Sequence, residues 1–146
     1  MKTFLYQTSK QHTTKLLFCC ITIIVLGIIT YCLNTFLIKP KINEKNSFFS
    51  YFICNFLNDI WAGSIIAAFA NILVLFRNSY FKSIVFYFII WIIESVIWEF
   101  LRPAILSVFN PFNKVPKLLF GDFISYALGT LIVFMLLRLL SKKHEF

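Results

Sequence analysis

Acidic side chains are rare in this chain of 146 residues, and their positions carry most of its chemical information. Only six are present, and four of them lie in or at the ends of long apolar runs: Asp59, Glu94, Glu99 and Asp122. Paired carboxylates can act as general acid and base. An intramembrane hydrolase needs two acids facing each other at depth, whereas Asp59 and Asp122 are expected near the membrane surface. The pattern therefore does not favour an enzyme.

The elements that position these acids are expected to be membrane-spanning helices. The chain is 60% hydrophobic and only 14% charged, with a mean hydropathy of +0.82. A soluble domain carries about a quarter charged residues, and one of this size could not hide so much apolar surface. We predict an all-α, polytopic membrane protein: a single membrane domain over residues 1–146, with four transmembrane helices in an antiparallel bundle. The expected spans are about 16–38, 56–76, 81–101 and 121–140.

An antiparallel order brings the acids together. The start of the second span, the end of the third and the start of the fourth meet at one membrane surface, which places Asp59, Glu99, Asp122 and Arg102 there. Glu94 is expected about 7.5 Å deeper than Glu99 because a helix rises about 1.5 Å per residue. A carboxylate inside a span costs about 2.5 kcal/mol or more, so it usually faces other helices and finds partners.

Helical spacing supports this inward placement. In the third span, polar and aromatic residues share one arc, and β-branched aliphatic residues occupy the opposite arc. The inward arc comprises Tyr87, Trp91, Glu94, Ser95, Trp98, Glu99 and Arg102. In the second span, Asp59, Gly63, Ala67 and Asn71 form a narrow stripe, and Gly129 lies on a similar stripe of the fourth span. We therefore predict close helix packing at Gly63, Ala67 and Gly129.

Two interpretations of the acidic cluster remain open. In the structural one, Arg102 pairs with Glu99 or Asp122, and the cluster only holds the helices together. In the functional one, the acids line a water-filled pocket that holds a cationic or polar lipid-linked headgroup. The apolar walls of that pocket are then Tyr87, Trp91, Trp98 and Tyr126. The residues predicted to bind the ligand are Asp59, Glu94, Trp98, Glu99, Arg102, Asp122 and Tyr126.

Other ligands have little support in the sequence. His12 and His144 lie outside the spans, so no metal site is predicted, and no motif indicates a cofactor. The net charge of +8 arises from basic residues at span ends and in loops, which is typical of membrane proteins and does not indicate nucleic acid. Eight basic residues against six favour an orientation with both termini in the cytoplasm. We expect a multi-pass protein of the bacterial cell membrane, in contact with membrane lipids.

Three short stretches resemble the VanZ-like small membrane proteins of bacteria and their relatives. They are Asp59-Ile60-Trp61-Ala62, Trp98-Glu99-Phe100-Leu101-Arg102 and Gly121-Asp122-Phe123-Ile124-Ser125-Tyr126-Ala127-Leu128-Gly129. The positions that match are Asp59, Glu99, Asp122 and Gly129, within about residues 56–140. The family often has Gln where this chain has Arg102, and the loop before Asp122 differs in length.

The resemblance implies a non-enzymatic envelope protein whose outward polar pocket engages a lipid, a peptide or a cell-wall precursor. Members of the family are associated with resistance to glycopeptide antibiotics and other envelope-active compounds. Two alternatives stay open beside it. One is an immunity-type protein against a membrane-targeting toxin. The other is an accessory subunit of a membrane complex, in which the small-residue stripe of the second span docks on a protein partner.

Overall fold

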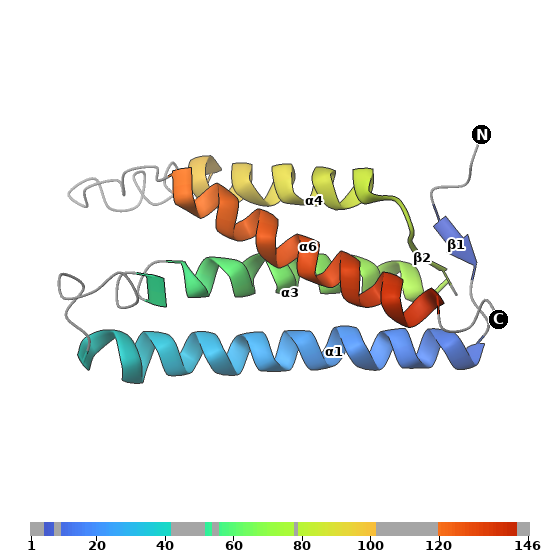
Figure 1. The fold of residues 1–146 in the computed structure, drawn as a ribbon, viewed down its shortest axis with the longest axis horizontal. Helices are drawn as coiled ribbons and strands as arrows, with labels where there is room; N and C mark the ends of the chain where they lie inside the picture. The colour runs from blue at the N-terminus through green and yellow to red at the C-terminus, as the bar shows by residue number, and fades with distance from the viewer. Residues whose placement is uncertain are drawn as a thin grey trace.

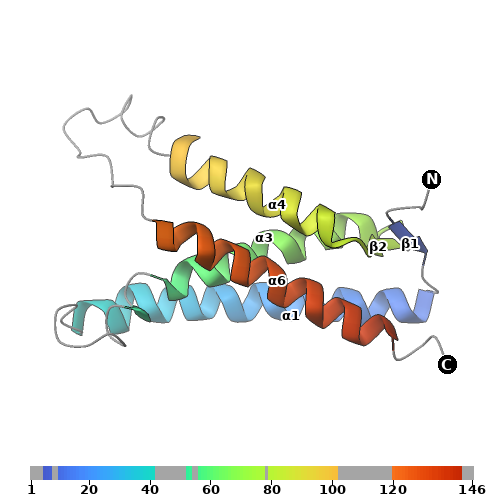
Figure 2. The same cartoon turned by 45° about the horizontal axis from the view of Figure 1, so that its top comes forward.

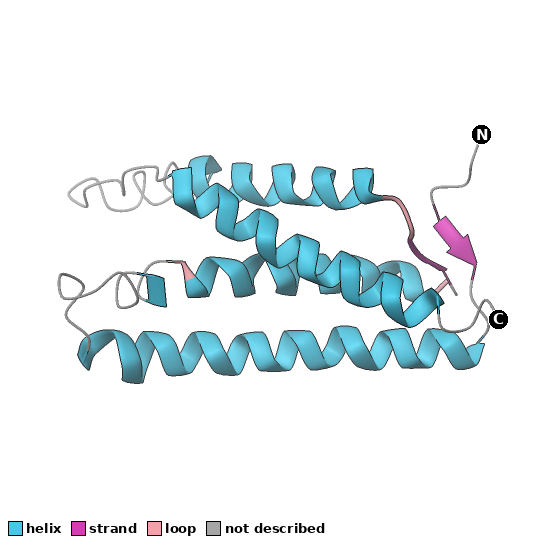
Figure 3. Ribbon diagram, in the orientation of Figure 1, coloured by secondary structure: helices cyan, strands magenta, loops and turns pink. Residues whose placement is uncertain are grey.

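The computed structural model describes residues 5–7, 10–41, 52–53, 56–77, 79–101 and 120–142. Most of this part of the chain is helical (Figure 3). The long helices are α1 at Lys10–Leu33, α3 at Leu57–Leu75, α4 at Ile84–Val96 and α6 at Phe120–Lys142. Two of them continue into π-helical segments, η1 at Asn34–Ile38 and η3 at Ile97–Leu101, and a 3-10 turn η2 at Lys39–Lys41 follows η1.

Helix α3 is the centre of the arrangement. Figure 1 shows α3 between α1 and α4, with α6 crossing it obliquely, and α1 and α4 running opposite to α3 and α6. The turned view in Figure 2 shows the same order. The most extensive helix contacts are those of α3 with α6 and with α1. The buried residues of α3 accordingly lie between Gly63 and Leu75, and its first turns are half-buried.

Three helices of the described chain are long and apolar enough to cross a membrane: Lys10–Ile38, Leu57–Leu75 and Gly121–Ser141. They coincide with three of the predicted spans, and the prediction of a helical membrane protein is confirmed at this level. The first helix begins before residue 16, because apolarity marks the part that crosses the hydrocarbon and a helix can extend beyond it. The segment predicted as a span at 81–101 forms α4 and its π-helical continuation η3, and it is not among these three helices.

The burial of α4 follows the predicted helical wheel. Its buried residues are Tyr87, Glu94 and Ser95. The β-branched residues of the opposite arc are exposed, namely Ile89, Ile92, Ile93, Val96 and Ile97. This apolar face is suited to contact with lipid chains, as the spacing predicts.

The crossing of α3 and α6 is a contact of backbone on backbone. A Cβ atom added to Gly63 would meet the carbonyl oxygen of Tyr126, and one added to Gly129 would meet the carbonyl oxygen of Ile60. The Ser64 hydroxyl donates a hydrogen bond of 3.1 Å to the Gly129 carbonyl. Ala67, on the same stripe, is fully buried. Small residues are thus what allows the two helices to approach so closely.

A small antiparallel sheet closes the end of the molecule where both termini lie (Figure 1). Strand β1 at Leu5–Gln7 pairs with β2 at Ser79–Phe81, with Tyr6 opposite Tyr80. The Tyr80 hydroxyl is 2.7 Å from the Ser141 hydroxyl, which ties β2 to the end of α6. The sequence did not predict this sheet, because strands of three residues are too short to show an alternating pattern.

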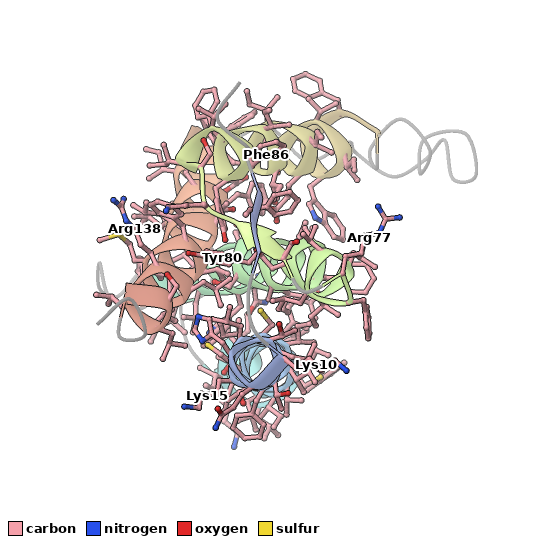
Figure 4. The ribbon with its side chains drawn as sticks, turned by 90° about the vertical axis from the view of Figure 1, so that its right-hand side faces the viewer. Lys10, Lys15, Arg77, Tyr80, Phe86 and Arg138 are labelled. Carbon is pink, nitrogen blue, oxygen red and sulfur yellow. The ribbon has the colours of Figure 1, made fainter. Side chains whose placement is uncertain are left out.

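Basic side chains surround this same end of the molecule. Figure 4 shows Lys10, Lys15, Arg77 and Arg138 on its periphery, with Tyr80 near the centre. Lys82 is exposed in the connection between β2 and α4. We call this the basic end of the molecule.

Candidate functional site

Three of the predicted acids share the opposite end of the molecule, where α3 and α6 begin and α4 ends (Figure 1). Asp59 lies in the first turn of α3, Glu99 in η3, and Asp122 in the first turn of α6. Asp59 is close enough to Glu99 and to Asp122 to interact electrostatically with both. All three are half-buried. We call this the acidic end. Arg102, which was predicted to join the acids, lies outside the described residues.

A cavity of about 380 Å³ lies next to Asp59. Helix α3 provides its floor, α1 with η2 one wall and η3 another, and α6 contributes a single residue. The floor residues are Asn58, Asp59, Trp61, Ala62, Ile65 and Ile66. The remaining lining residues are Ile28, Tyr31, Lys39, Trp98 and Tyr126. Its volume is at the lower end of the range of about 300–1,000 Å³ that is usual for small-molecule sites.

The lining of this cavity changes from polar to apolar along the helix axis. Lys39, Asn58 and Asp59 lie towards the acidic end, and Ile65 and Ile66 lie deeper. From Asp59 to Ile66 the helix rises about 10.5 Å, at about 1.5 Å per residue. The cavity is thus matched to a molecule that has a polar part and an apolar part.

Two π-helical segments and a network of asparagine hydrogen bonds shape the polar part of the cavity. The π-helical segments η1 and η3 both lie at the acidic end, and π-helical turns are frequent at functional sites. Asn34 in η1 is fully buried, and its amide donates hydrogen bonds of 2.9 Å to the Ile53 carbonyl and to Asn58 Oδ1. The Asn58 amide in turn donates to Thr35 Oγ1 at 3.1 Å. This network joins η1 to the start of α3 and fixes Asn58 in the cavity floor.

Two hydrogen bonds hold α4 and its continuation η3 against α6, one from each segment. The Tyr126 hydroxyl donates to Glu99 Oε1 at 3.0 Å, and Trp91 Nε1 donates to the Phe123 carbonyl at 2.8 Å. Tyr126 is also close enough to Asp59 to interact with it. Glu99 therefore positions Tyr126, which lines the cavity, although Glu99 does not line it.

Glu94, which the sequence predicts as a ligand-binding residue, is not among the residues that line this cavity. It is fully buried, and neither of its carboxyl oxygens has a hydrogen-bond partner among the described residues. It interacts electrostatically with Asp59. A helical wheel separates inward from outward positions, but it cannot separate a packed interior from the wall of a cavity.

Of the predicted ligand-binding residues, the structure thus places Asp59, Trp98 and Tyr126 in the cavity lining. Asp122 lies near Asp59 but outside that lining. Sequence reasoning missed Tyr31, Lys39, Asn58 and Trp61. Two of these could have been found from the sequence. Asn58 is a polar residue near the start of an apolar run, and Lys39 directly follows another such run.

Metal chemistry has no visible basis in the described part of the chain, where no three His, Cys, Asp or Glu side chains come together in a way that could hold a metal ion. Comparison with protein-family models, with curated proteins and with solved structures gave no match. The site must therefore be interpreted from its own geometry.

Proposed function

We propose that this protein is a non-enzymatic, VanZ-like protein of the bacterial cell membrane that binds an amphiphilic ligand in the cavity beside Asp59. In this proposal α4 with η3 is the third of the four spans of an antiparallel bundle. The observation that carries the proposal is the cavity itself, which has charged and polar residues at one end and isoleucines at the other. Small-molecule sites are typically apolar pockets with a few placed polar groups.

Access from the membrane supports an amphiphile as the ligand. Ile28 and Tyr31 line the cavity, yet 52% and 47% of their surfaces are exposed. They lie on α1, whose outward residues are apolar and suited to contact with lipid. The ligand can therefore enter sideways from the bilayer, with its apolar part remaining against α1. A lipid, a lipid-linked precursor or a membrane-active peptide has this character.

The orientation follows from the distribution of basic residues. In our proposal the basic end, with both termini, lies in the cytoplasm, because basic residues are enriched on that side of membrane proteins. The acidic end and its cavity then lie at the outer surface of the membrane, where envelope precursors and envelope-active compounds are encountered.

The accessory-subunit alternative requires the small-residue stripe of α3 to be available as a docking surface. Gly63 and Ala67 are buried, and Gly63 contacts the backbone of α6 in the same chain. They are therefore not exposed for docking on another protein. The immunity-type alternative has no specific observation in its favour.

A blocking variant tests the proposal directly. Ala62→Phe places a ring on the floor of the cavity, and Leu73→Phe is the matched control because Leu73 is on the same helix but 57% exposed. The probe is a spin-labelled lysophospholipid added to the protein in dodecyl maltoside micelles. We expect electron paramagnetic resonance to show an immobilised fraction with the wild type and Leu73→Phe, and to lose it with Ala62→Phe. Equal immobilisation by both variants would contradict the proposal.

A second test separates binding from a purely structural role of the acid. Asp59→Ala should abolish any envelope-linked resistance phenotype while the protein still accumulates in the membrane. Failure of Asp59→Ala to accumulate would instead support the structural interpretation of the acidic cluster. Immunoblotting of membrane fractions distinguishes these outcomes.

A further inference from the structure

The cavity contains two opposite charges that do not neutralise each other by direct contact. Lys39 and Asp59 both line it and interact electrostatically. Among the described residues, however, they form no direct ion pair. Lys39 is exposed at the mouth, whereas Asp59 is half-buried further in. Two separated opposite charges facing one cavity are complementary to a ligand that carries both signs.

Four aromatic side chains line the same cavity as Asp59. Tyr31 and Trp61 come from α1 and α3, and Trp98 and Tyr126 come from η3 and α6. Aromatic rings attract cations through their electron-rich faces, and several rings together form the cages that recognise ammonium groups. When ionised, the carboxylate of Asp59 adds an opposite charge to this environment. The inner polar part of the cavity is thus suited to an ammonium group.

The mouth of the cavity is suited to a phosphate. The Lys39 ammonium is a compact, mobile cation of the kind that often binds phosphate in proteins. Asn58 lies beside Asp59 on the floor and is held by Asn34 and Thr35. The volume of about 380 Å³ accommodates a headgroup and the beginning of a chain rather than a whole lipid. The remaining chains can lie along the exposed apolar residues of α1, such as Val25 and Ile29.

We propose that the cavity binds a phospholipid with a zwitterionic headgroup, whose phosphate contacts Lys39 and whose ammonium group is held by Asp59 among the four aromatic rings. This inference rests on the proposed function and specifies its ligand class. The proposed site should bind zwitterionic phospholipids more tightly than anionic ones. Anionic phospholipids lack the ammonium group and would place only negative charge near Asp59.

Native mass spectrometry in dodecyl maltoside tests the assignment by titrating the full chain with phosphatidylethanolamine, phosphatidylglycerol or diacylglycerol. We expect the wild type to bind phosphatidylethanolamine about tenfold more tightly than phosphatidylglycerol, because one charge-assisted contact is lost. Asp59→Asn should remove this preference. Lys39→Gln should weaken both phospholipids by about tenfold and keep the preference. Lys41→Gln is the matched control, since Lys41 is exposed in the same turn but does not line the cavity.

Each contrary result has its own meaning. If diacylglycerol binds as tightly as phosphatidylethanolamine, or if Lys39→Gln has no effect, the zwitterionic assignment is wrong while amphiphile binding stands. If free phosphoethanolamine competes as well as the lipid, the ligand is a soluble zwitterion and the phospholipid assignment fails. If no amphiphile binds and Ala62→Phe changes nothing, the proposed function fails as well. Circular dichroism of Asp59→Asn checks that a loss of preference does not reflect unfolding.

Discussion

The close contact between α3 and α6 predicts that Gly129→Ala lowers the free energy of unfolding, which is the opposite of what helix propensity alone predicts. Gly129 lies in the middle of α6, where Ala normally stabilises a helix by about 1 kcal/mol relative to Gly. In the structure, a Cβ atom at Gly129 would meet the Ile60 carbonyl oxygen, would lie 2.8 Å from the Ser64 backbone nitrogen and would lie 3.0 Å from the Ile60 carbonyl carbon. All three are backbone atoms of α3, so no side chain can move aside. Gly129→Ala must therefore push the two helices apart.

The magnitude follows from three contributions. Overpacking of a close contact costs about 1–3 kcal/mol. Moving α6 away also weakens the hydrogen bond from Ser64 to the Gly129 carbonyl, which is worth roughly 0.6 kcal/mol on average in membrane proteins. The gain in helix propensity offsets about 1 kcal/mol of this loss. We expect Gly129→Ala to lower the free energy of unfolding by about 0.6–2.6 kcal/mol.

Gly27 in α1 provides the matched control. An added Cβ there would meet only side-chain atoms, Ile65 Cδ1 and Cγ1 at 2.8 Å and Trp61 Cε3 at 3.1 Å. The end of an isoleucine side chain can rotate away, so Gly27→Ala should be neutral or stabilising. Reversible unfolding in mixed micelles with increasing sodium dodecyl sulfate, followed by circular dichroism, measures both variants. If Gly129→Ala is at least as stable as Gly27→Ala, the backbone contact of α3 and α6 does not exist as described.

Three further predictions concern other parts of the molecule. Glu94→Leu should raise the free energy of unfolding by about 1–3 kcal/mol in the same assay, because it removes a buried carboxyl that has no hydrogen-bond partner among the described residues; a loss of stability would show that Glu94 has an essential partner. Tyr80→Phe and Ser141→Ala should show a coupling energy of about 0.5–1.5 kcal/mol in a double-mutant cycle, and strictly additive effects would exclude their hydrogen bond. In a cysteine-free background, Lys39→Cys should react with an impermeant thiol reagent on intact cells, because the proposed orientation places it at the outer surface. Arg77→Cys should react only after permeabilisation. The reverse pattern of reactivity would mean that the orientation is inverted.

The sequence predicted what depends on repeated patterns. Apolar runs located the helices, and the wheel of α4 separated buried Tyr87 and Ser95 from the exposed isoleucines. The order of the spans placed Asp59, Glu99 and Asp122 at one end. The helices and the burial of α4 are predictable because each pattern extends over many residues. The grouping of the acids is predictable because it follows from the direction of successive helices.

Features that depend on a single turn were not predictable. The π-helical segments η1 and η3 alter the direction of side chains at the acidic end, and the wheel assumed a regular α-helix there. Lys39 comes directly after η1, so its place at the mouth of the cavity depends on the π-helical geometry of that segment. The pairing of β1 with β2 depends on contacts distant in sequence. Each of these requires tertiary structure that spacing alone does not specify.

The acids illustrate why convergence at one end does not make one site. Glu99 accepts a hydrogen bond from Tyr126, so its role is to hold η3 against α6. Glu94 is enclosed in the interior without a hydrogen-bond partner among the described residues. Only Asp59 combines half-burial with a place in the cavity lining, and it interacts electrostatically with the other three acids and with Lys39.

In the proposed site, the negative charge of the cluster would therefore act on a ligand through Asp59, while its neighbours reinforce the local potential. A cation bound at Asp59 relieves the repulsion among these carboxylates, and an anion bound there increases it. This reasoning links the two interpretations of the cluster. In the proposed site, the acids that stabilise the helix contacts also raise the affinity of the one among these four that lines the cavity for a cationic group, so structural and binding roles reinforce each other at the acidic end.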